Sequence, residues 1–569
     1  MEHSPYALPA VILVSLVTVT IGTYGVRLAR TTSDFLVASR SVSPRWNAAA
    51  IGGEYLSAAS FLGVAGLIMK YGVDMLWYPV GFAAGYLALQ LFVAAPLRRS
   101  GAFTIPDFTE ARLGSRALRR LAAGFVVFIG WLYLVPQLQG AGLTLGTVTG
   151  APYWVGALVV GAVVTANVAS GGMRSITFVQ AFQYWLKLTA ISFPVAFLLL
   201  AWQHDGRPEL SPPTTPAFTA VTTVTIDTAV RVAVDEPTTV TVDGDTERLT
   251  PGLHEFGAGT RLTFPAGADV PHVEGLAPRD GPSWLAPGAS GELAGGHALF
   301  GVYSLILATF LGTMGLPHVL VRFYTNPDGT AARRTTLVVL GLLGAFYLFP
   351  TVYGALGRVY APALLMTGQT DAVVLVLPGA AVGGLTGHVL GGLAAAGAFA
   401  AFLSTSSGLL VSVAGVLSTD VVGRGSVRDF RLAALVAGLV PLFLALNVSG
   451  LDVSQVVGLA FAVAASSFCP LLVLGIWWRG LTWTGAAAGL IVGGGAAAGA
   501  VLAAIVGPPL SGWPAALVAQ PAAWTVPLAF AVMIAVSLAT RGRIPADVGR
   551  TMLRLHAPDT LGVGGRARV

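Results

Sequence analysis

The sequence predicts an all-α polytopic membrane protein with about thirteen transmembrane helices and a small β-rich extracytoplasmic insert. Three observations support this fold class. The 569 residues are 55% hydrophobic and only 10% charged, whereas a typical soluble domain is about 25% charged. Apolar runs of about 20 residues recur along the chain, and each is long enough to cross a bilayer as a helix. One segment, residues 203–297, replaces these runs with alternating β-branched and polar residues, which is typical of short strands.

The apolar runs define the expected spans in order. We expect spans at residues 6–28, 46–71, 74–96, 120–146, 152–169, 176–202, 298–317, 335–358, 383–417, 430–448, 453–475, 482–506 and 524–540. The chain then divides into helices one to six (1–202), the insert (203–297), helices seven to thirteen (298–540) and a cytoplasmic tail (541–569).

Charge is unevenly distributed along the chain. Residues 203–297 contain 13 of the 26 acidic and 5 of the 32 basic residues, so this segment has a net charge of −8 and the rest +14. The basic residues lie in short loops between apolar runs, where they act as topology signals. They predict a plasma-membrane protein with the N-terminus and the insert outside and the C-terminus inside. Its surroundings are then the lipid bilayer, and no nucleic-acid partner is expected; nothing in the sequence indicates an oligomeric state.

The second expected span, residues 46–71, is unusual for a simple membrane anchor. It combines four glycines with hydroxyl groups and one carboxylate, Glu54. Each glycine in a helix interior costs roughly 1 kcal/mol relative to alanine. This pattern fits a helix that opens near the middle of the membrane and offers its carbonyls to a cation. It also fits a small-residue face that lets helices approach closely.

A short motif recurs in the seventh expected span. Residues 60–67, SFLGVAGL, match residues 309–316, TFLGTMGL. The two spans each begin a block of five helices, so the second block enters the membrane with inverted topology. Paired glycine-interrupted spans in two inverted halves point to the central site of a transporter.

The ninth expected span could contribute to a cation site. Ala401, Ser404 and Thr405 are spaced i, i+3 and i+4, so they share one helix face. A carbonyl and two hydroxyls on that face could bind a hard cation such as sodium, which accepts neutral oxygen ligands. Alternatively, the hydroxyls simply bond to carbonyls of the preceding turn.

Several motifs in the same order resemble the sodium:solute symporter family. They are GGEYLSAASFLG in the second span, IPDF at 105–108, GGMR at 171–174, GLPHVLVRF at 315–323 and STD at 418–420. These motifs are most similar to those of the acetate permease and monocarboxylate branch of the family. The resemblance covers nearly the whole chain except residues 203–297. It implies a LeuT-type fold, a five-plus-five inverted repeat.

The resemblance also implies site residues. Sodium, Na⁺, would be the coupling ion, bound by backbone oxygens at Gly53 and Leu56, by the carbonyl of Ala401 and by the hydroxyls of Ser404 and Thr405. The solute pocket would lie beside the opened second span and face the seventh. Its expected residues are Glu54, Tyr55, Ser60, Phe61, Lys187, Thr309 and Gly312. Many relatives have an aspartate at the start of the sixth span where this chain has Thr177.

Lys187 and Glu54 are lone ionisable residues within apolar spans. Such groups usually face the protein interior and have a partner. We hypothesise that they neutralise each other or that Lys187 turns toward the solute; a snorkelling lysine is the simpler alternative.

These features together predict a sodium-coupled symporter that imports a small, acetate-like monocarboxylate by alternating access. An alternative within transport is a symporter of a neutral or zwitterionic solute such as proline, coupled either to sodium or to protons. An alternative of another class is a transporter-like membrane sensor with the insert as its ligand module. No Ser/His/Asp arrangement, metal cluster or phosphate loop suggests an enzyme.

Overall fold

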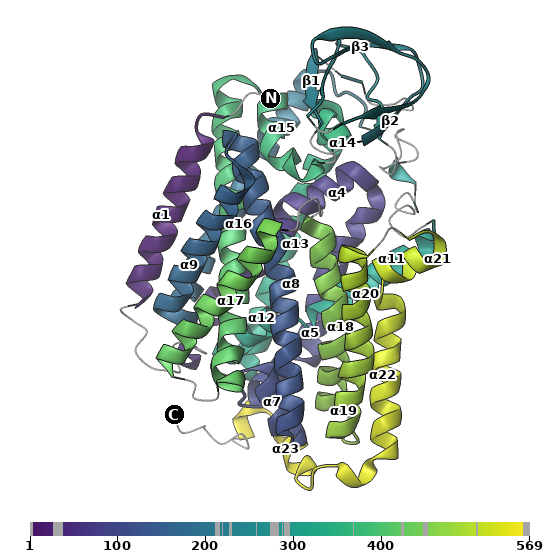
Figure 1. The fold of residues 1–569 in the computed structure, drawn as a ribbon. Coiled ribbons are helices and arrows are strands. Elements are labelled where there is room, and N and C mark those ends of the chain that lie inside the picture. Colours follow the sequence, from purple (N-terminus) through teal and green to yellow (C-terminus); the bar gives the residue numbers. More distant parts are fainter. Residues whose placement is uncertain are drawn as a thin grey trace.

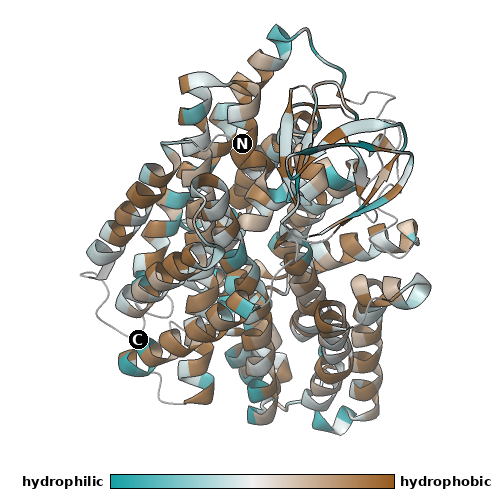
Figure 2. Ribbon diagram, turned by 45° about the horizontal axis from the view of Figure 1, so that its top comes forward, coloured by the Kyte–Doolittle hydropathy of each residue, from teal (hydrophilic) through white to brown (hydrophobic). Residues whose placement is uncertain are grey.

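The computed structural model is a bundle of long helices with a β-rich insert at one end (Figure 1). Hydrophobic residues dominate the helices, whereas hydrophilic residues are frequent in the insert and at the helix ends (Figure 2). The structure describes residues 4–26, 38–210, 217–218, 220–226, 230–257, 259–273, 284–286, 288, 296–367, 369–422, 426–447, 453–507 and 510–561.

Within these residues, eleven helices are long and apolar enough to cross a membrane, and one broken pair makes twelve. The eleven are α1 (Ala7–Val26), α5 (Trp77–Phe92), α8 (Arg116–Thr149), α9 (Tyr153–His204), α11 (Ala298–Thr313), α13 (Gly329–Tyr360), α16 (Gly384–Val416), α17 (Val427–Asn447), α18 (Val453–Trp477), α19 with α20 (Trp483–Gly489 and Gly495–Val506, joined by a π-helical turn) and α22 (Ala522–Ala539). The broken pair is α3 (Pro44–Tyr55) followed by a π-helical turn, Ala59–Gly63, and α4 (Val64–Tyr71).

The difference from the expected thirteen spans lies in α9. This helix has 52 residues, roughly 78 Å at 1.5 Å per residue, which is more than twice the ~30 Å hydrocarbon core. Gly172 interrupts it with φ +55° and ψ −155°, values outside the helical region. The stretch therefore bends there into two segments, which correspond to the separately expected spans 152–169 and 176–202.

Shorter helices connect these spans and cover both ends of the bundle. They are α6 (Ala94–Arg99), α7 (Ile105–Leu113), α12 (Pro317–Val321), α14 (Ala363–Thr367), α15 (Val373–Ala381), α21 (Gly512–Ala519) and α23 (Val548–His556), with 3₁₀ turns at Ala38–Arg40, Val73–Leu76, Arg322–Thr325, Thr370–Ala372, Arg541–Arg543 and Asp559–Leu561 and a π-helical turn at Leu417–Val421.

The seventh expected span is also interrupted. Helix α11 ends at Thr313, and α12 begins at Pro317 after a short non-helical stretch. The shared SFLG/TFLG motif does not mark equivalent points, because Ser60 follows the break in its span whereas Thr309 precedes the break in its own. The sequence repeat therefore identifies the two interrupted spans but not the position of either interruption.

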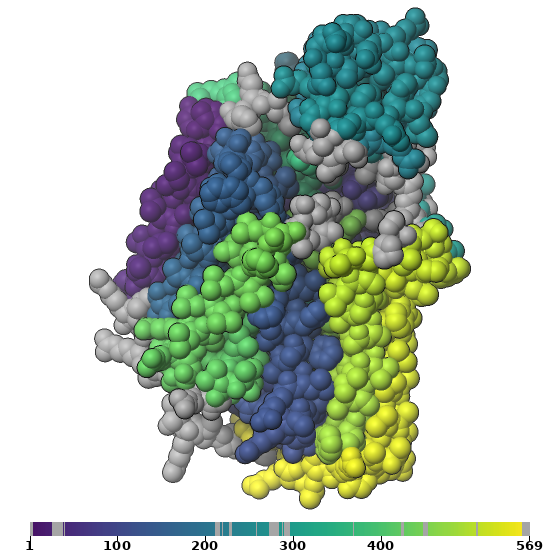
Figure 3. Space-filling model, viewed as in Figure 1, coloured from purple at the N-terminus to yellow at the C-terminus, as the bar shows by residue number. Residues whose placement is uncertain are grey.

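The described part of the insert contains seven strands in two antiparallel sheets. The insert projects from one end of the helices (Figure 3). One sheet has the order β1 (Thr222–Thr225), β6 (Arg261–Phe264), β3 (Thr238–Val242), β4 (Asp245–Leu249), and the other β5 (Gly252–Phe256), β2 (Val230–Val234), β7 (His272–Val273). The turn between β3 and β4 is at Asp243-Gly244, where both residues have positive φ, as a tight hairpin requires. The expected β-rich insert is confirmed.

Among the described residues, the insert contacts the helical bundle at α14 and beside α4. Met366 of α14 is fully buried in the core of the insert. At the second place, Trp284 donates its indole N–H to the carbonyl of Ile68 in α4, over 2.7 Å. The ring also lies 5.1 Å from the Arg358 guanidinium of α13, and Gly72, at φ +82°, leaves room for the Trp284 backbone. This contact attaches the insert to the end of the broken span.

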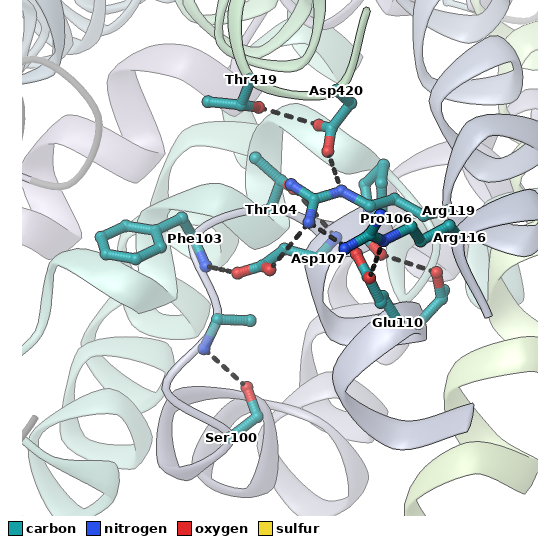
Figure 4. A network of polar contacts seen from close by, with 12 residues as sticks. Ser100, Phe103, Thr104, Pro106, Asp107, Glu110, Arg116, Arg119, Thr419 and Asp420 are labelled. Atoms are coloured by element: carbon teal, nitrogen blue, oxygen red, sulfur yellow. Dashed lines mark hydrogen bonds and ion pairs between the residues drawn. The ribbon is translucent and has the colours of Figure 1, made fainter. Parts of the chain in front are cut away.

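The opposite end of the bundle contains a cluster of charged residues that joins two motifs distant in the sequence (Figure 4). The guanidinium of Arg119 in α8 contacts Asp107 at 3.5 Å and Glu110 at 2.7 Å, and it also bonds Asp420. Asp107 belongs to the IPDF motif and Asp420 to the STD motif. Arg119 therefore holds the segments after the third and ninth expected spans together.

Candidate functional site

The break after α3 exposes main-chain groups in the middle of the protein. Leu56 has φ −72° and ψ 79° and ends the helix, and the two halves of the span meet at 69°. Ser57 N–H bonds Tyr55 O at 2.8 Å instead of the carbonyl of Gly53. The carbonyls of Gly53, Glu54 and Leu56 are therefore available to side chains from other helices. The expectation that this span opens is confirmed in the structure.

Lys187 of α9 occupies this opening. Its ammonium donates to Leu56 O at 2.6 Å, to Ser404 Oγ at 2.9 Å and also to Gly53 O. The side chain is fully buried, so the snorkelling alternative is wrong. Three of the five expected cation-binding residues thus contact the nitrogen of a lysine.

The other two expected cation-binding residues lie in the same place. Ser404 donates its hydroxyl proton to Ala401 O at 3.0 Å, and Thr405 donates to Glu54 O at 2.5 Å. Because Ser404 and Thr405 are on α16, these bonds and the Lys187 contacts connect α3, α9 and α16. The structure therefore brings the five residues Gly53, Leu56, Ala401, Ser404 and Thr405 together.

Glu54 pairs with an arginine and not with Lys187. Arg322 donates its Nε–H to Glu54 Oε2 at 2.6 Å, and both side chains are at most 1% exposed. Arg322 also bonds Thr177 Oγ1 at 2.9 Å and the side-chain oxygen of Gln180. The hypothesised Glu54–Lys187 ion pair is thus wrong, because Arg322 bonds Oε2 of Glu54 and Lys187 bonds main-chain and hydroxyl oxygens instead.

Arg322 is a site residue that the sequence reasoning missed. It follows GLPHVLV in an arginine-rich segment whose composition is typical of an inner loop, yet it is fully buried. The available signal was the unpaired Glu54: a buried carboxylate needs a positive partner. Thr177 accepts a hydrogen bond from this arginine where relatives were expected to have an aspartate.

The oxygens at the break suit a sodium ion chemically, but the ammonium already contacts three of them. Two like unit charges 4 Å apart repel by about 4 kcal/mol at an effective dielectric constant of ~20. Lys187 in this position therefore opposes the binding of sodium among these oxygens.

Three of the expected solute-site residues lie close to the break. Tyr55 bonds Thr313 Oγ1 at 2.9 Å and packs edge-on against Tyr86, with ring centroids 4.7 Å apart. Ser60 bonds the hydroxyl of Tyr347 at 2.8 Å, and the Phe61 ring lies 6.2 Å from that of Phe346. These contacts place α3 and the following π-helical turn against α5, α11 and α13.

Two further expected solute-site residues, Thr309 and Gly312, face neighbouring helices. A Cβ placed on Gly81 of α5 would lie 1.9 Å from Thr309 Oγ1, and one placed on Gly312 would lie 2.5 Å from the carbonyl of Phe461 in α18. Glycine at both positions allows this close approach. Thr309 and Gly312 therefore set the packing of α11 on α5 and α18.

Several buried polar atoms near the break have no hydrogen-bond partner among the described residues. They include the hydroxyl of Tyr86, Nε2 of Gln137, both ring nitrogens of His318, Oε1 of Glu54 and the hydroxyl of Ser406. Gln137 accepts from Ala58 N–H at 3.0 Å, and the ring of Tyr133, whose hydroxyl bonds Ser57, lies 5.2 Å from His318. Buried polar groups are normally paired, so these atoms are candidates to bind a solute. Of these residues, the sequence reasoning selected only Glu54 as a site residue.

A broken membrane span, a second interrupted span and buried ionisable residues beside the break are features typical of secondary transporters. Two solved structures show the same fold. One is a Na⁺-coupled sialic acid symporter in a substrate-bound outward-open state, with a TM-score of 0.61 at 14% identity, covering 93% of this chain and 98% of that one. The other is Mhp1, a nucleobase-cation-symport-1 family transporter, with a TM-score of 0.51 at 13% identity, covering 91% and 98%.

The chain belongs to the sodium:solute symporter family, whose model matches residues 35–203 and 295–493. The unmatched segment between them corresponds to the insert. A monocarboxylic acid transporter of Corynebacterium glutamicum is 30% identical over 540 residues, which cover 89% of this chain and 86% of that protein. An uncharacterized symporter, YwcA, of Bacillus subtilis is 29% identical over 489 residues, covering 83% and 80%. The chain is therefore a multi-pass membrane transporter and not an enzyme.

Proposed function

We propose that this protein is a symporter that moves a small monocarboxylate across the membrane by alternating access. The observation on which this depends is the group of unpartnered buried polar atoms on Tyr86, Gln137 and His318, beside the broken span. A hydroxyl, an amide NH₂ and an imidazole N–H are donors, and donors suit the oxygens of a carboxylate.

The charge of the buried cluster also favours a monoanion. Glu54 and Arg322 neutralise each other, and Lys187 adds one positive charge. A single carboxylate would offset that charge, whereas a neutral or zwitterionic solute such as proline would leave it uncompensated. The name of the Corynebacterium glutamicum relative, a monocarboxylic acid transporter, supports the same solute class.

Transport would proceed by rocking of the helices around the break, which is common in transporters built from inverted repeats. A cation at the carbonyls of the break and a solute beside it can favour each other, and this coupling is reciprocal. The family name and the similarity to a Na⁺-coupled sialic acid symporter make sodium the first candidate for the coupling ion, unless a group of the chain itself takes the place of that ion. In this structure the positively charged group at the carbonyls of Gly53 and Leu56 is the ammonium of Lys187.

Counterflow in proteoliposomes tests the solute class without requiring any ion gradient. Vesicles are loaded with acetate, propionate, pyruvate or proline, and uptake of the same labelled solute is measured. We expect exchange of at least one of the three monocarboxylates and none of proline. Exchange of proline alone would contradict the proposal, and so would the absence of exchange for all four solutes from protein that is folded.

Substitution of Tyr86 tests the location of the site. A hydrogen bond to a charged group contributes about 1.5–3 kcal/mol, so Tyr86→Phe should raise the KM for the carboxylate about tenfold or more. Tyr303→Phe is the matched control, because Tyr303 lies on the outside of α11 with 64% exposure. Equal KM values for the two variants would place the solute elsewhere.

A further inference from the structure

We propose that Lys187 replaces the sodium ion of this site with its own tethered ammonium, so that solute transport by this protein does not require sodium. The counterflow experiment that tests this inference rests on the proposed function, whereas the thermal-unfolding experiment does not.

The hydrogen bonds at the break match an ammonium in number and direction. An ammonium has three N–H donors and no acceptor. Lys187 donates to Gly53 O, Leu56 O and Ser404 Oγ, which are three acceptors. Ser404 commits its own hydroxyl proton to Ala401 O at 3.0 Å, so its oxygen accepts from Lys187. Every donor of the ammonium is satisfied by an oxygen that was expected to bind sodium.

The packing of α9 against α3 keeps the lysine in this position. A Cβ on Gly53 would lie 2.2 Å from the carbonyl of Gln180, and one on Gly52 would lie 2.8 Å from the ring of Tyr184. Tyr184 and Gln180 are one and two turns before Lys187 on the same helix. The two helices are therefore in close contact where the lysine reaches across, and its whole side chain is buried.

The charged groups around Lys187 leave the ammonium available as the cation of the site. Glu54 of α3 faces the same region, but its carboxylate bonds Arg322, so the ion pair contributes no net charge. Arg322 in turn bonds Gln180 and Thr177 of α9, and Gln180 donates to Ser404 O at 2.7 Å. On the facing side of α16, Ser404 and Thr405 are neutral. The positive charge at the break thus belongs to Lys187.

The chain's use of basic residues agrees with this role. Only two of its 32 basic residues are lysines, Lys70 and Lys187, and the other 30 are arginines. A guanidinium is planar and forked, whereas an ammonium is a compact point charge on a flexible stem. A pocket of converging carbonyl and hydroxyl oxygens that fits a monatomic cation accepts the ammonium and excludes the guanidinium.

The first experiment needs no solute. The thermal unfolding midpoint of purified wild type is measured in detergent at one pH and ionic strength, with NaCl or choline chloride. We expect no difference for wild type, and a rise of several degrees in sodium for Lys187→Ala, because that variant frees the oxygens for the ion. Lys70→Gln removes the other lysine as a matched control and should behave like wild type.

The second experiment measures counterflow of the transported monocarboxylate under the same two conditions. Wild type should exchange at rates within twofold in sodium and in choline, and Lys187→Ala should exchange at least tenfold faster in sodium than in choline. If Lys187→Ala does not fold, the wild-type comparison decides, and Lys187→Gln serves as the second variant.

A wild-type protein that is stabilised by sodium, or that exchanges tenfold faster in sodium, would overturn the inference. So would folded Lys187→Ala and Lys187→Gln proteins that are both insensitive to sodium. If none of the tested carboxylates is transported, the proposed function fails on its own, and the unfolding measurement still decides the role of Lys187.

Discussion

Individual residues of the site could be chosen from the sequence, but their partners could not. Glu54 and Lys187 stood out as ionisable groups in apolar runs, and Ser404 and Thr405 as hydroxyls on one helix face. The structure places all four at the break. The partner of Glu54 is Arg322, which lies 268 positions later in the chain. Arg322 belongs to a segment that composition alone assigns to a loop, so the sequence did not indicate this pair.

The Glu54–Arg322 pair gives a stability prediction. Removal of one partner from a buried ion pair typically costs about 3–5 kcal/mol, because the other charge stays buried without compensation. Arg322→Ala should therefore lower the thermal unfolding midpoint strongly. The double variant Glu54→Gln/Arg322→Met should recover much of the loss, since it leaves no buried charge. A double variant no more stable than the single one would show that Arg322 acts mainly through Thr177 and Gln180.

At the level of elements, the broken second span was predictable, but the physical role of its glycines was not. Glycine-rich composition suggested a helix that opens near the middle of the membrane, without fixing the residues at which it opens. In the structure Gly52 and Gly53 are helical, and the chain leaves the helix at Leu56 and Ser57. The sequence suggested either an opened helix or a small-residue packing face, and the structure contains both. Gly52 and Gly53 allow close packing, and the break follows them.

This distinction predicts different outcomes for two glycine substitutions. Gly53→Ala should destabilise the protein severely, because the new methyl group would lie 2.2 Å from a backbone oxygen of α9 that cannot move aside. Gly124→Ala, in α8, has no atom within 4 Å of the new methyl group. It should be neutral or stabilise by up to about 1 kcal/mol through helix propensity. Folded yield and the unfolding midpoint measure both, and equal losses would contradict the packing argument.

For the whole molecule, the spans could be located from hydropathy because each is long and continuous. The thirteen expected spans agree with the structure once the break in the second span and the bend at Gly172 are counted. The strand pairing within the insert could not be derived, since β1 pairs with β6 and β2 with both β5 and β7, and alternation of residues does not specify partners.

Single cysteines test the predicted orientation in the membrane. The one native cysteine, Cys469, is buried, so wild type should not react with a membrane-impermeant maleimide. Thr246→Cys in the insert should react in intact cells, and Ala546→Cys, in the segment before α23, only after permeabilisation. Both replaced side chains are exposed. The reverse pattern would show that the basic end of the bundle lies outside.

The indole of Trp284 joins the insert to the main chain of α4, the second half of the broken span. The half-helix cannot tilt away from α13 without either breaking that hydrogen bond or moving the tryptophan with it. Anything that immobilises the strands, such as a bound antibody fragment, would consequently also restrain α4.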